Sequence, residues 1–294
     1  MSTVVLVGAT SGLGRQAAGQ LARQKHRLIL VGRDERRGAS LVREIGQTGA
    51  PPSLFVAADV STGAGVATVV RAVEAATDRV DVLINNAGVM CQRRTLTDEG
   101  MELNFAVHHL APFSMTARLL PLLRRAGGRV INTNSVAHQG ALFTPGRIDI
   151  DFEDLQSERY SPYLAYSVSK LANLLFTLEF HRRVPDVPIA AVHPGMVRTR
   201  LVRSMHSPGF WLLSTSTRYL VLRSPRQAGQ VLTRLAITDD LRSGAYYDRY
   251  RPSAPSAQAQ NRRTAVRLWQ VTESLRGPFP STASGRRIDP SGRP

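Results

Sequence analysis

The sequence contains a single cysteine, Cys91, and this scarcity excludes several classes of protein. One cysteine can form neither an intrachain disulfide nor a cysteine-based metal cluster, so a secreted disulfide scaffold is excluded. Long apolar runs are missing too: the longest apolar-leaning stretch, 210–222, spans about 13 residues and contains Arg218, whereas a membrane-spanning helix needs roughly 20. No basic segment followed by an apolar one opens the chain, which predicts no signal peptide. We therefore expect a soluble, cytoplasmic protein without a transmembrane segment or a metal site.

Lysine is almost absent, although the protein is strongly basic. Only Lys25 and Lys170 are lysines among 38 cationic residues, and the formal net charge is +16. Such an excess could indicate a nucleic-acid partner, but no basic patch interleaved with aromatic residues and no recognition helix stands out. The arginine bias also fits a GC-rich coding sequence. Because attraction of an anionic cofactor is a sufficient use for the charge, we expect no nucleic-acid partner.

Short apolar runs alternate with segments of helical period along the 294 residues, 43% of which are hydrophobic. This pattern predicts a parallel sheet with both faces covered by helices, a doubly wound α/β sandwich of the Rossmann type. We expect one domain over 1–276, with a lid-like insertion at about 198–224, and a disordered basic tail over 277–294. The expected strands are 4–7, 27–31, 54–57, 82–84, 129–133, 189–192 and a short one near 245–247; the expected helices include 13–24, 36–45, 66–76, 171–180, 226–236 and 261–275.

A glycine-rich turn separates the first expected strand from the first expected helix. Glycine there lets the backbone turn tightly and approach a pyrophosphate, while the helix N-terminus supplies N–H donors and the positive end of a dipole. A glycine-rich surface turn is the alternative, but the strand before and the helix after favour dinucleotide binding. The residues of this predicted phosphate-binding turn are Gly8, Ala9, Thr10, Ser11, Gly12, Leu13 and Gly14.

The second expected strand ends at Gly32-Arg33. A carboxylate at this strand tip would bind the adenosine ribose 2′-hydroxyl and select NAD, whereas the Arg33 guanidinium can pair with a 2′-phosphate. Arg15, just after the glycine turn, could help. We therefore predict NADP(H), with NAD(H) as a second cofactor. The alternatives are that Arg33 is only a solvated loop residue or that Asp34 takes the carboxylate role.

Tyr166 and Lys170 lie four residues apart in a segment of helical pattern and so share one helix face. A nearby ammonium favours a phenolate and is expected to lower the tyrosine pKa by about 1–3 units from roughly 10, which makes the phenol usable in proton transfer near neutral pH. A compact ammonium is not replaceable by guanidinium for close ribose contacts. Taken alone, this spacing is weak and is more often structural.

Together, these ordered motifs resemble the short-chain dehydrogenase/reductase family over roughly residues 3–250. The further motifs that carry the resemblance are Asp59-Val60, Asn85-Asn86-Ala87-Gly88, Ser135, and Pro194-Gly195 followed by Thr199. Within the family, the chain is most similar to the retinol-dehydrogenase-like and WW-domain-oxidoreductase-like group. The residues behind that finer similarity are Leu103 to Leu110, Val130-Ile131-Asn132, Ser135 to His138, Leu268-Trp269 and Ser274-Leu275.

The resemblance implies a role for each matching residue. Tyr166 is the expected general acid or base, Ser135 the expected hydrogen-bond donor to the substrate oxygen, and Lys170 the expected ligand of the nicotinamide ribose. The other implied cofactor contacts are Asp59 and Val60 at the adenine, Asn86, Ala87 and Gly88 at the ribose, and Pro194, Gly195, Val197 and Thr199 near the carboxamide. Family members form dimers or tetramers and some are monomers, so a homodimer or homotetramer is one expectation.

His108 departs from the family pattern, which places a catalytic-relay asparagine at this position. A histidine could hold the relay water by one ring nitrogen, the relay could be broken, or the residue could be merely tolerated in the helix. Asn104, one helical turn earlier, is expected at the surface. We expect His138 and His193 to be positional and Cys91 to be an inert small apolar residue.

The sequence thus predicts an NADP(H)-dependent oxidoreductase that interconverts a carbonyl and an alcohol on a lipophilic small molecule. The apolar side chains of 210–213 and 219–222 are expected to form a pocket lid, with core packing as the alternative. A non-catalytic dinucleotide-binding sensor or interaction protein is the second hypothesis, supported mainly by His108.

Overall fold

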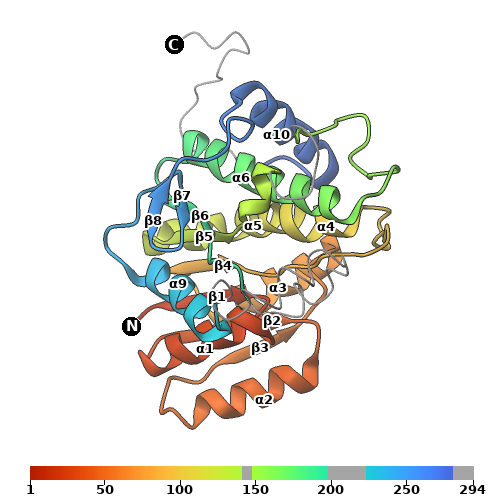
Figure 1. Cartoon of the computed structure of the whole chain (residues 1–294). Coiled ribbons are helices and arrows are strands. Elements are labelled where there is room, and N and C mark those ends of the chain that lie inside the picture. Colours follow the sequence, from red (N-terminus) through yellow and green to blue (C-terminus); the bar gives the residue numbers. More distant parts are fainter. Residues whose placement is uncertain (141–147, 198–222, 281–294) are drawn as a thin grey trace.

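The computed structural model describes residues 1–140, 148–197 and 223–280, and Figure 1 shows its elements. A parallel sheet alternates with helices along the chain, as the sequence predicts. The strands are β1 (Thr3–Val7), β2 (Arg27–Gly32), β3 (Leu54–Ala57), β4 (Val82–Asn85), β5 (Arg129–Thr133), β6 (Ile189–His193), β7 (Ala245–Asp248) and β8 (Arg251–Ser253). The helices are α1 (Gly12–Arg23), α2 (Glu35–Gly46), α3 (Gly63–Ala76), α4 (Leu103–Phe105), α5 (Ala111–Ala126), α6 (Pro162–Arg183), α9 (Pro225–Ile237) and α10 (Arg262–Arg276), with a π-helical turn over Ala106–Leu110 and a 3₁₀ turn over Val136–Gln139.

The strand order is β3-β2-β1-β4-β5-β6-β7-β8, and every pairing is parallel except that of β7 with β8. The order reverses direction between β1 and β4, which is the arrangement of a doubly wound sheet. The expected fold class is therefore confirmed. The strand β8 was not predicted, because Pro252 lies at its centre and proline is depleted in strands.

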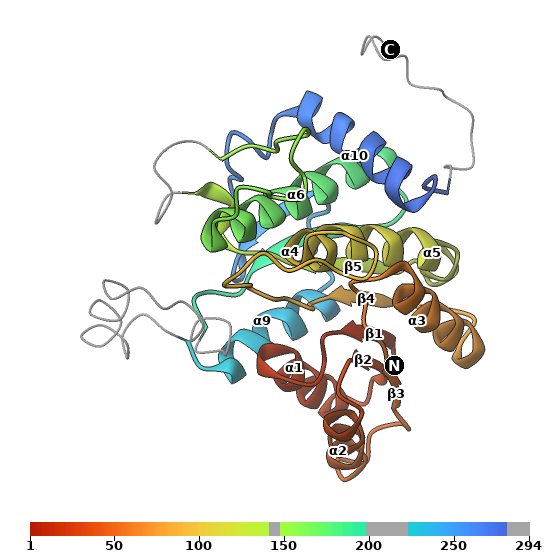
Figure 2. The same cartoon turned by 90° about the vertical axis from the view of Figure 1, so that its right-hand side faces the viewer.

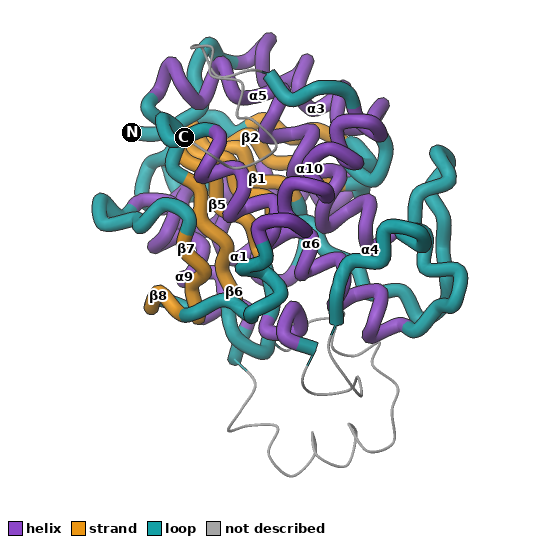
Figure 3. The backbone as a smooth tube through the Cα atoms, turned by 90° about the horizontal axis from the view of Figure 1, so that it is seen from above, coloured by secondary structure: helices purple, strands orange, loops and turns teal. Residues whose placement is uncertain are grey.

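Apolar side chains on the two faces of the sheet form two separate cores. On one face, β-strand residues such as Leu6 and Leu30 pack with Leu21 of α1 and Val231 of α9. On the other face, Val5 and related residues pack with α3, α5 and α6. Figure 2 shows this layering, and Figure 3 shows the helices on either side of the strands when the molecule is viewed from above. The inner strands β1, β2, β4, β5 and β6 are buried on both faces, which explains their near-continuous apolar sequence, whereas the edge strands β3 and β8 are partly exposed.

The long helix α6 is enclosed by the sheet on one side and by α10 on the other (Figure 2), so its side chains from Ser169 to Phe180 are all buried. Residues after the end of α10 also pack on the core. Phe279 is 8% exposed, and its ring lies 5.1 Å from that of Phe113, 4.8 Å from that of Trp269 and 5.8 Å from that of Phe180. The chain therefore packs on the core as far as Phe279, beyond the expected domain end at 276, while 281–294 lie outside the described residues and the disordered tail stays a prediction.

Candidate active site

The carboxyl ends of the parallel strands bring the sequence-predicted motifs to one edge of the sheet, where ligands bind in such folds. Gly8, with a φ of +85°, packs so closely on the end of β4 that an added Cβ would lie 2.6 Å from the Ala87 nitrogen. Gly14 fits as tightly, since its Cβ would lie 2.1 Å from the Gly8 oxygen. Asn86 closes the contact by donating its Nδ2 hydrogen bond to the Gly8 carbonyl at 2.9 Å. The glycine turn and the Asn86–Gly88 turn therefore form one unit.

Replacement of Gly14 by alanine should destabilise the protein by about 1–3 kcal/mol, because the new methyl group meets the Gly8 carbonyl and the Asn86 amide. This is the opposite of the usual effect of Gly→Ala within a helix, a gain of up to about 1 kcal/mol. Gly46 in α2 is the matched control, since no atom lies within 4 Å of its added Cβ. Urea denaturation of both variants measures the difference. Equal stabilisation by both would contradict the close packing of the turn.

The first turn of α1 has backbone donors that no capping side chain takes up. Ser11 at the N-cap makes no side-chain hydrogen bond to the helix, whereas Asp34, Thr62 and Asn261 each cap the helix they precede. Backbone N–H groups at a helix N-terminus can bind the pyrophosphate of a dinucleotide, and the neighbouring glycines let the phosphates come close to the backbone. The residues of the predicted phosphate-binding turn are thus arranged as that function needs.

Arg33 and Asp59 meet at the adenine end of the predicted cleft, at the tips of β2 and β3. Their side chains are 3.7 Å apart at closest approach and both are well exposed, so the guanidinium stays accessible for a 2′-phosphate. Arg15 instead pairs with Glu44. Val60 is buried and lines a hollow together with Ala87. The strand ends therefore bring the predicted adenine-site and ribose-site residues to the same region.

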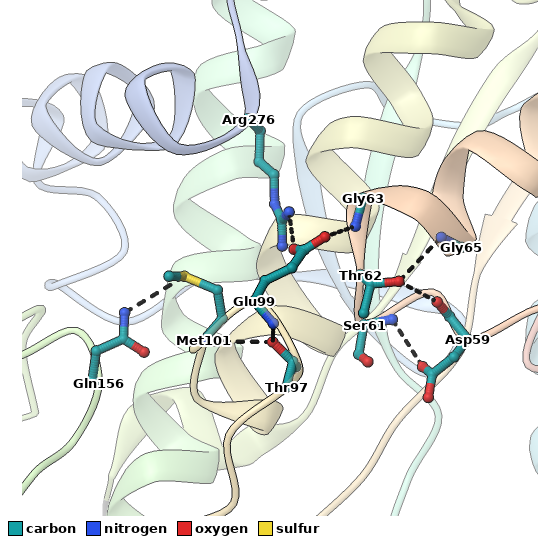
Figure 4. A network of polar contacts seen from close by, with 10 residues as sticks. All are labelled: Asp59, Ser61, Thr62, Gly63, Gly65, Thr97, Glu99, Met101, Gln156 and Arg276. Atoms are coloured by element: carbon teal, nitrogen blue, oxygen red, sulfur yellow. Dashed lines mark hydrogen bonds and ion pairs between the residues drawn. The ribbon is translucent and has the colours of Figure 1, made fainter.

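A polar network holds the start of α3, directly after the adenine-site residues (Figure 4). Glu99 accepts a hydrogen bond from the Gly63 amide and pairs with Arg276 at the end of α10. Thr62 donates its hydroxyl hydrogen bond to the Asp59 carbonyl at 3.3 Å and caps the helix. The last turn of α10 is thereby tied to the turn that carries Asp59. Sequence reasoning missed Glu99 because nothing in its local pattern marks a contact across 177 positions.

Tyr166 and Ser135 lie close enough for the serine side chain to influence the phenol, and Lys170 lies beside them. Ser135 follows β5, and its Oγ accepts a hydrogen bond from the Ala137 amide at 3.2 Å. Tyr166 lies on α6, and this helix begins at Pro162, earlier than the expected start at residue 171. The Lys170 Nζ lies 5.7 Å from the centre of the Tyr166 ring and donates to the Thr133 carbonyl at 3.0 Å. The three residues that sequence reasoning assigned to catalysis therefore meet in space.

The protonation preferences in this cluster differ from the sequence expectation. Burial raises the pKa of Tyr166 to about 12 and outweighs the opposite effect of the Ser135 side chain. Burial also lowers the pKa of Lys170 to about 7. The expectation that Lys170 lowers the tyrosine pKa is wrong in this structure, because the ammonium is directed to the Thr133 carbonyl and is itself desolvated. Tyr166 is a neutral phenol at neutral pH.

The buried Lys170 should make the cofactor-free protein more stable as pH rises from about 7 to 10. Across this window the unfolded lysine keeps a proton that the folded one loses, so the folding equilibrium shifts toward the native state. The gain is on the order of a few kcal/mol, and it ends near pH 10, where unfolded tyrosine ionises before buried Tyr166. Urea midpoints measured against pH, with Lys170→Met as the control lacking the slope, test this. A flat wild-type profile would contradict it.

His108 does not hold a relay water, because protein groups occupy both its ring nitrogens. The Val89 amide donates to Nε2 at 3.1 Å, and Nδ1 lies 2.8 Å from the Ser169 Oγ. Asn104 is fully buried, not at the surface, and donates to Glu102 and Tyr160. A π-helical turn follows α4 directly and changes which residues share a face of the helix. A periodicity of 3.6 residues therefore does not predict the directions of the side chains here.

His138 has the positional role that the sequence predicts. Its Nδ1 lies 2.7 Å from the Ser135 carbonyl, and its Nε2 accepts from the Ser256 amide at 3.3 Å. His193 at the end of β6 is also largely buried, and burial lowers its pKa to about 4. Burial likewise raises the pKa of the Cys91 thiol, which makes it a poor nucleophile at neutral pH.

Buried amide side chains that sequence reasoning did not assign hold the end of β5. Asn134 accepts from the Ser135 amide at 2.7 Å and donates to Asn173 at 2.8 Å. Asn173 in turn donates to the His108 carbonyl at 2.8 Å. Short polar residues at the tip of a buried strand are the one signal that could have found them. They connect the Ser135 loop to α6 and so fix the distance between Ser135 and Tyr166.

After β6, Pro194, Gly195 and Val197 run along the same edge, and the Arg223 amide donates to the Met196 carbonyl at 2.8 Å. Gly195 has a φ of +94°. Thr199 and most of the predicted lid, 198–222, lie outside the described residues.

Comparison with known proteins identifies the family to which this arrangement belongs. A family model described as short chain dehydrogenase matches residues 2–144. Human retinol dehydrogenase 13 is 36% identical over 284 residues, which cover 94% of this chain and 84% of the relative. The chain belongs to the short-chain dehydrogenase/reductase family. It is an oxidoreductase of the class that acts on CH–OH groups.

Three further proteins resemble the chain in sequence or in fold. A Streptomyces sp. (strain C5) protein named for daunorubicin C-13 ketoreduction, DnrU, is 37% identical and covers 94% of this chain and 92% of its own length. The crystal structure of an uncharacterised protein from Mycobacterium paratuberculosis has a TM-score of 0.73 and 33% identity, with 95% of each chain covered. Gluconobacter frateurii L-sorbose reductase, complexed with NADPH and L-sorbose, shares the fold at a TM-score of 0.67 and 21% identity, with 86% of this chain and 97% of that one covered. In the part of the chain that the structure describes, no helix is long and apolar enough to cross a bilayer.

Proposed function

We propose that this protein is an NADP(H)-dependent oxidoreductase that interconverts a carbonyl and an alcohol on a lipophilic small molecule, with Tyr166 as general acid and base. The observation that carries the proposal is the meeting of Tyr166, Ser135 and Lys170 at the sheet edge that also holds the glycine turn, with the Lys170 Nζ 5.7 Å from the centre of the Tyr166 ring. If Tyr166 only filled space in the core, packing would not require the Ser135 hydroxyl and the buried Lys170 amine beside it.

The side chains divide the work of carbonyl reduction. Ser135 donates a hydrogen bond to the substrate oxygen and stabilises the negative charge that develops there. Tyr166, a neutral phenol at neutral pH, gives its proton to that oxygen. Lys170 holds the nicotinamide ribose hydroxyls and offers a positive charge one helical turn from the phenol. A bound nicotinamide supplies the hydride. In alcohol oxidation the same groups act in reverse: Tyr166 must first lose its proton, and the phenolate then accepts the proton of the alcohol.

Arg33 supports a preference for NADP(H). It is exposed at the tip of β2, next to the glycine turn, and can pair with a 2′-phosphate. No carboxylate stands at the Gly32 position, and Asp34 is engaged as the N-cap of α2 and in a pair with Arg37. Structural neighbours such as an alcohol dehydrogenase from Thermococcus sibiricus were solved with an NADP derivative.

A lipophilic substrate is supported by apolar side chains near the catalytic residues in the sequence. Leu164 on α6 is 37% exposed and Met196 after β6 is 39% exposed, whereas most residues of α6 and β6 are buried. Two relatives are named for dehydrogenation of retinol and for ketoreduction of daunorubicin at C-13, and they are the second support.

A panel of lipophilic aldehydes and ketones, assayed with NADPH and with NADH, tests the proposal. We expect NADPH oxidation on members of the panel and a larger thermal shift with NADP than with NAD. Tight NADPH binding without turnover on any compound, in either direction, would instead support the non-catalytic sensor. A stronger effect of NAD would contradict the role of Arg33.

A further inference from the structure

A chain of hydrogen bonds runs from the turn after β4 to the backbone of the catalytic tyrosine. The Val89 amide donates to His108 Nε2 at 3.1 Å. The His108 Nδ1 lies 2.8 Å from the Ser169 Oγ, and that hydroxyl donates to the Tyr166 carbonyl at 2.6 Å. His108 and Ser169 are both fully buried, so no solvent competes for these groups.

The Val89 amide and the Tyr166 carbonyl, at the two ends of this series of hydrogen bonds, fix the direction of every bond between them. A backbone amide can only donate and a backbone carbonyl can only accept. The Val89 amide therefore makes Nε2 an acceptor, and the Tyr166 carbonyl uses the Ser169 hydroxyl hydrogen. Ser169 must then accept from His108, which places the imidazole proton on Nδ1. Only the neutral Nδ1–H form of His108 satisfies all four groups.

We propose that His108 is a positioning residue, a neutral imidazole strut that fixes Tyr166 relative to the cofactor-binding turn through Ser169. This inference rests on the proposed function, in which Tyr166 must meet a substrate held beside the nicotinamide. Displacement of a reacting group by about 1 Å can cost up to about 100-fold in rate, so a link between the two elements is consequential.

The surroundings of His108 keep it in the required form. Burial lowers its pKa well below the ordinary value, and the nearby Lys170 charge lowers it further. The titratable groups that face it are Lys170 and Tyr166, whose ring meets the imidazole edge-on at 5.4 Å; His109 adjoins it on its own turn. The backbone is anchored as well, because Asn173 donates to the His108 carbonyl. A charged imidazole would turn an N–H toward the Val89 N–H and break the strut.

Two substitutions of His108 separate the two ends of the strut. In His108→Asn, the amide nitrogen takes the place of Nδ1 and keeps the donor to Ser169, but the acceptor for Val89 is lost. In His108→Gln, the amide oxygen reaches the place of Nε2 and keeps the acceptor, but the donor to Ser169 is lost. We expect His108→Asn chiefly to raise the KM for NADPH, about three- to tenfold, and His108→Gln chiefly to lower kcat, by about tenfold. Ser169→Ala should also lower kcat about tenfold, and Ser169→Thr, which restores a hydroxyl, should recover it.

The wild-type enzyme gives a second measurement that needs no variant to fold. Nitrogen chemical shifts of labelled histidine should show His108 neutral at pH 7 with its proton on Nδ1. A proton on Nε2, a charged ring, or a kcat for Ser169→Ala equal to that of the wild type would overturn the strut. Equal changes of kcat and KM in all variants, in proportion to lost thermal stability, would overturn it too. Full activity of Tyr166→Phe would instead refute the proposed function, whatever the outcome at His108.

Discussion

Tyr166→Phe should lower kcat for carbonyl reduction by about 10²–10⁴-fold, the contribution typical of a positioned general acid. The phenyl ring fills the same buried space next to His108, so the fold should persist, while no proton remains for the developing alkoxide. The dissociation constant for NADPH should change little, because the ring does not supply the phosphate or adenine contacts. Steady-state kinetics and fluorescence titration of NADPH measure the two effects separately.

Tyr250→Phe is the matched control for this substitution. Tyr250 is exposed near α9, where the Arg234 guanidinium lies 5.5 Å from its ring, remote in sequence from Ser135 and Lys170. Loss of the same hydroxyl there should leave kcat within about twofold of wild type, since no proton transfer involves it. A small effect at position 166, comparable with the control, would show that another group protonates the substrate.

Trp269→Ala should lower the free energy of unfolding by about 3–5 kcal/mol, the range for removal of a large aromatic side chain from a core. The indole of α10 is stacked 6.0 Å from Phe176, lies 5.1 Å from Phe113, and has the Arg183 guanidinium 4.7 Å from its ring. Removal of the indole leaves a cavity between α5, α6 and α10. The surrounding side chains can close this cavity only if α10 moves toward α5 and α6. Urea denaturation with an unchanged m-value measures the loss.

Leu275→Ala on the same helix separates packing from helix propensity. Leu275 is 38% exposed, so its truncation should cost no more than about 0.5 kcal/mol. If Trp269→Ala destabilised the protein no more than this control, the aromatic cluster would contribute little and α10 would be a peripheral helix. A large difference would confirm that residues beyond the first 250 complete the core.

The sheet and its flanking helices were predictable because apolar periodicity reports burial directly. Six buried strands were expected within one residue of their observed ends, from the first at Thr3–Val7 to the sixth at Ile189–His193. Local pattern failed where a distant partner decides the structure. Phe279 lies between two prolines in a stretch without apolar periodicity, and the aromatic rings of α5, α6 and α10 explain its burial.

The gathering of the glycine turn, Ser135, Tyr166 and Lys170 at one edge of the sheet was also predictable, because motif order places them at successive strand ends, while their roles stay predictions. Their electrostatics were not predictable. The pKa of Tyr166 depends on how deeply the phenol is buried and on where the Lys170 amine points, and neither follows from a spacing of four residues. Asn104 was misjudged because the Tyr160 side chain reaches it from the loop before α6. The sequence could not decide between the alternatives for His108, because its partner Ser169 lies far along the chain on α6. The predicted homodimer or homotetramer and the cytoplasmic location stay predictions.

The two outer strands of the sheet limit how copies of this protein could join. At one edge, β3 is four residues long and follows Pro51-Pro52; at the other, β8 is three residues long and holds Pro252 opposite Tyr247. Short edges that carry proline offer few free amides to an incoming strand. Growth of the sheet from molecule to molecule is thereby disfavoured at both edges, so that among the described residues the helical faces are the more suitable surfaces for self-association.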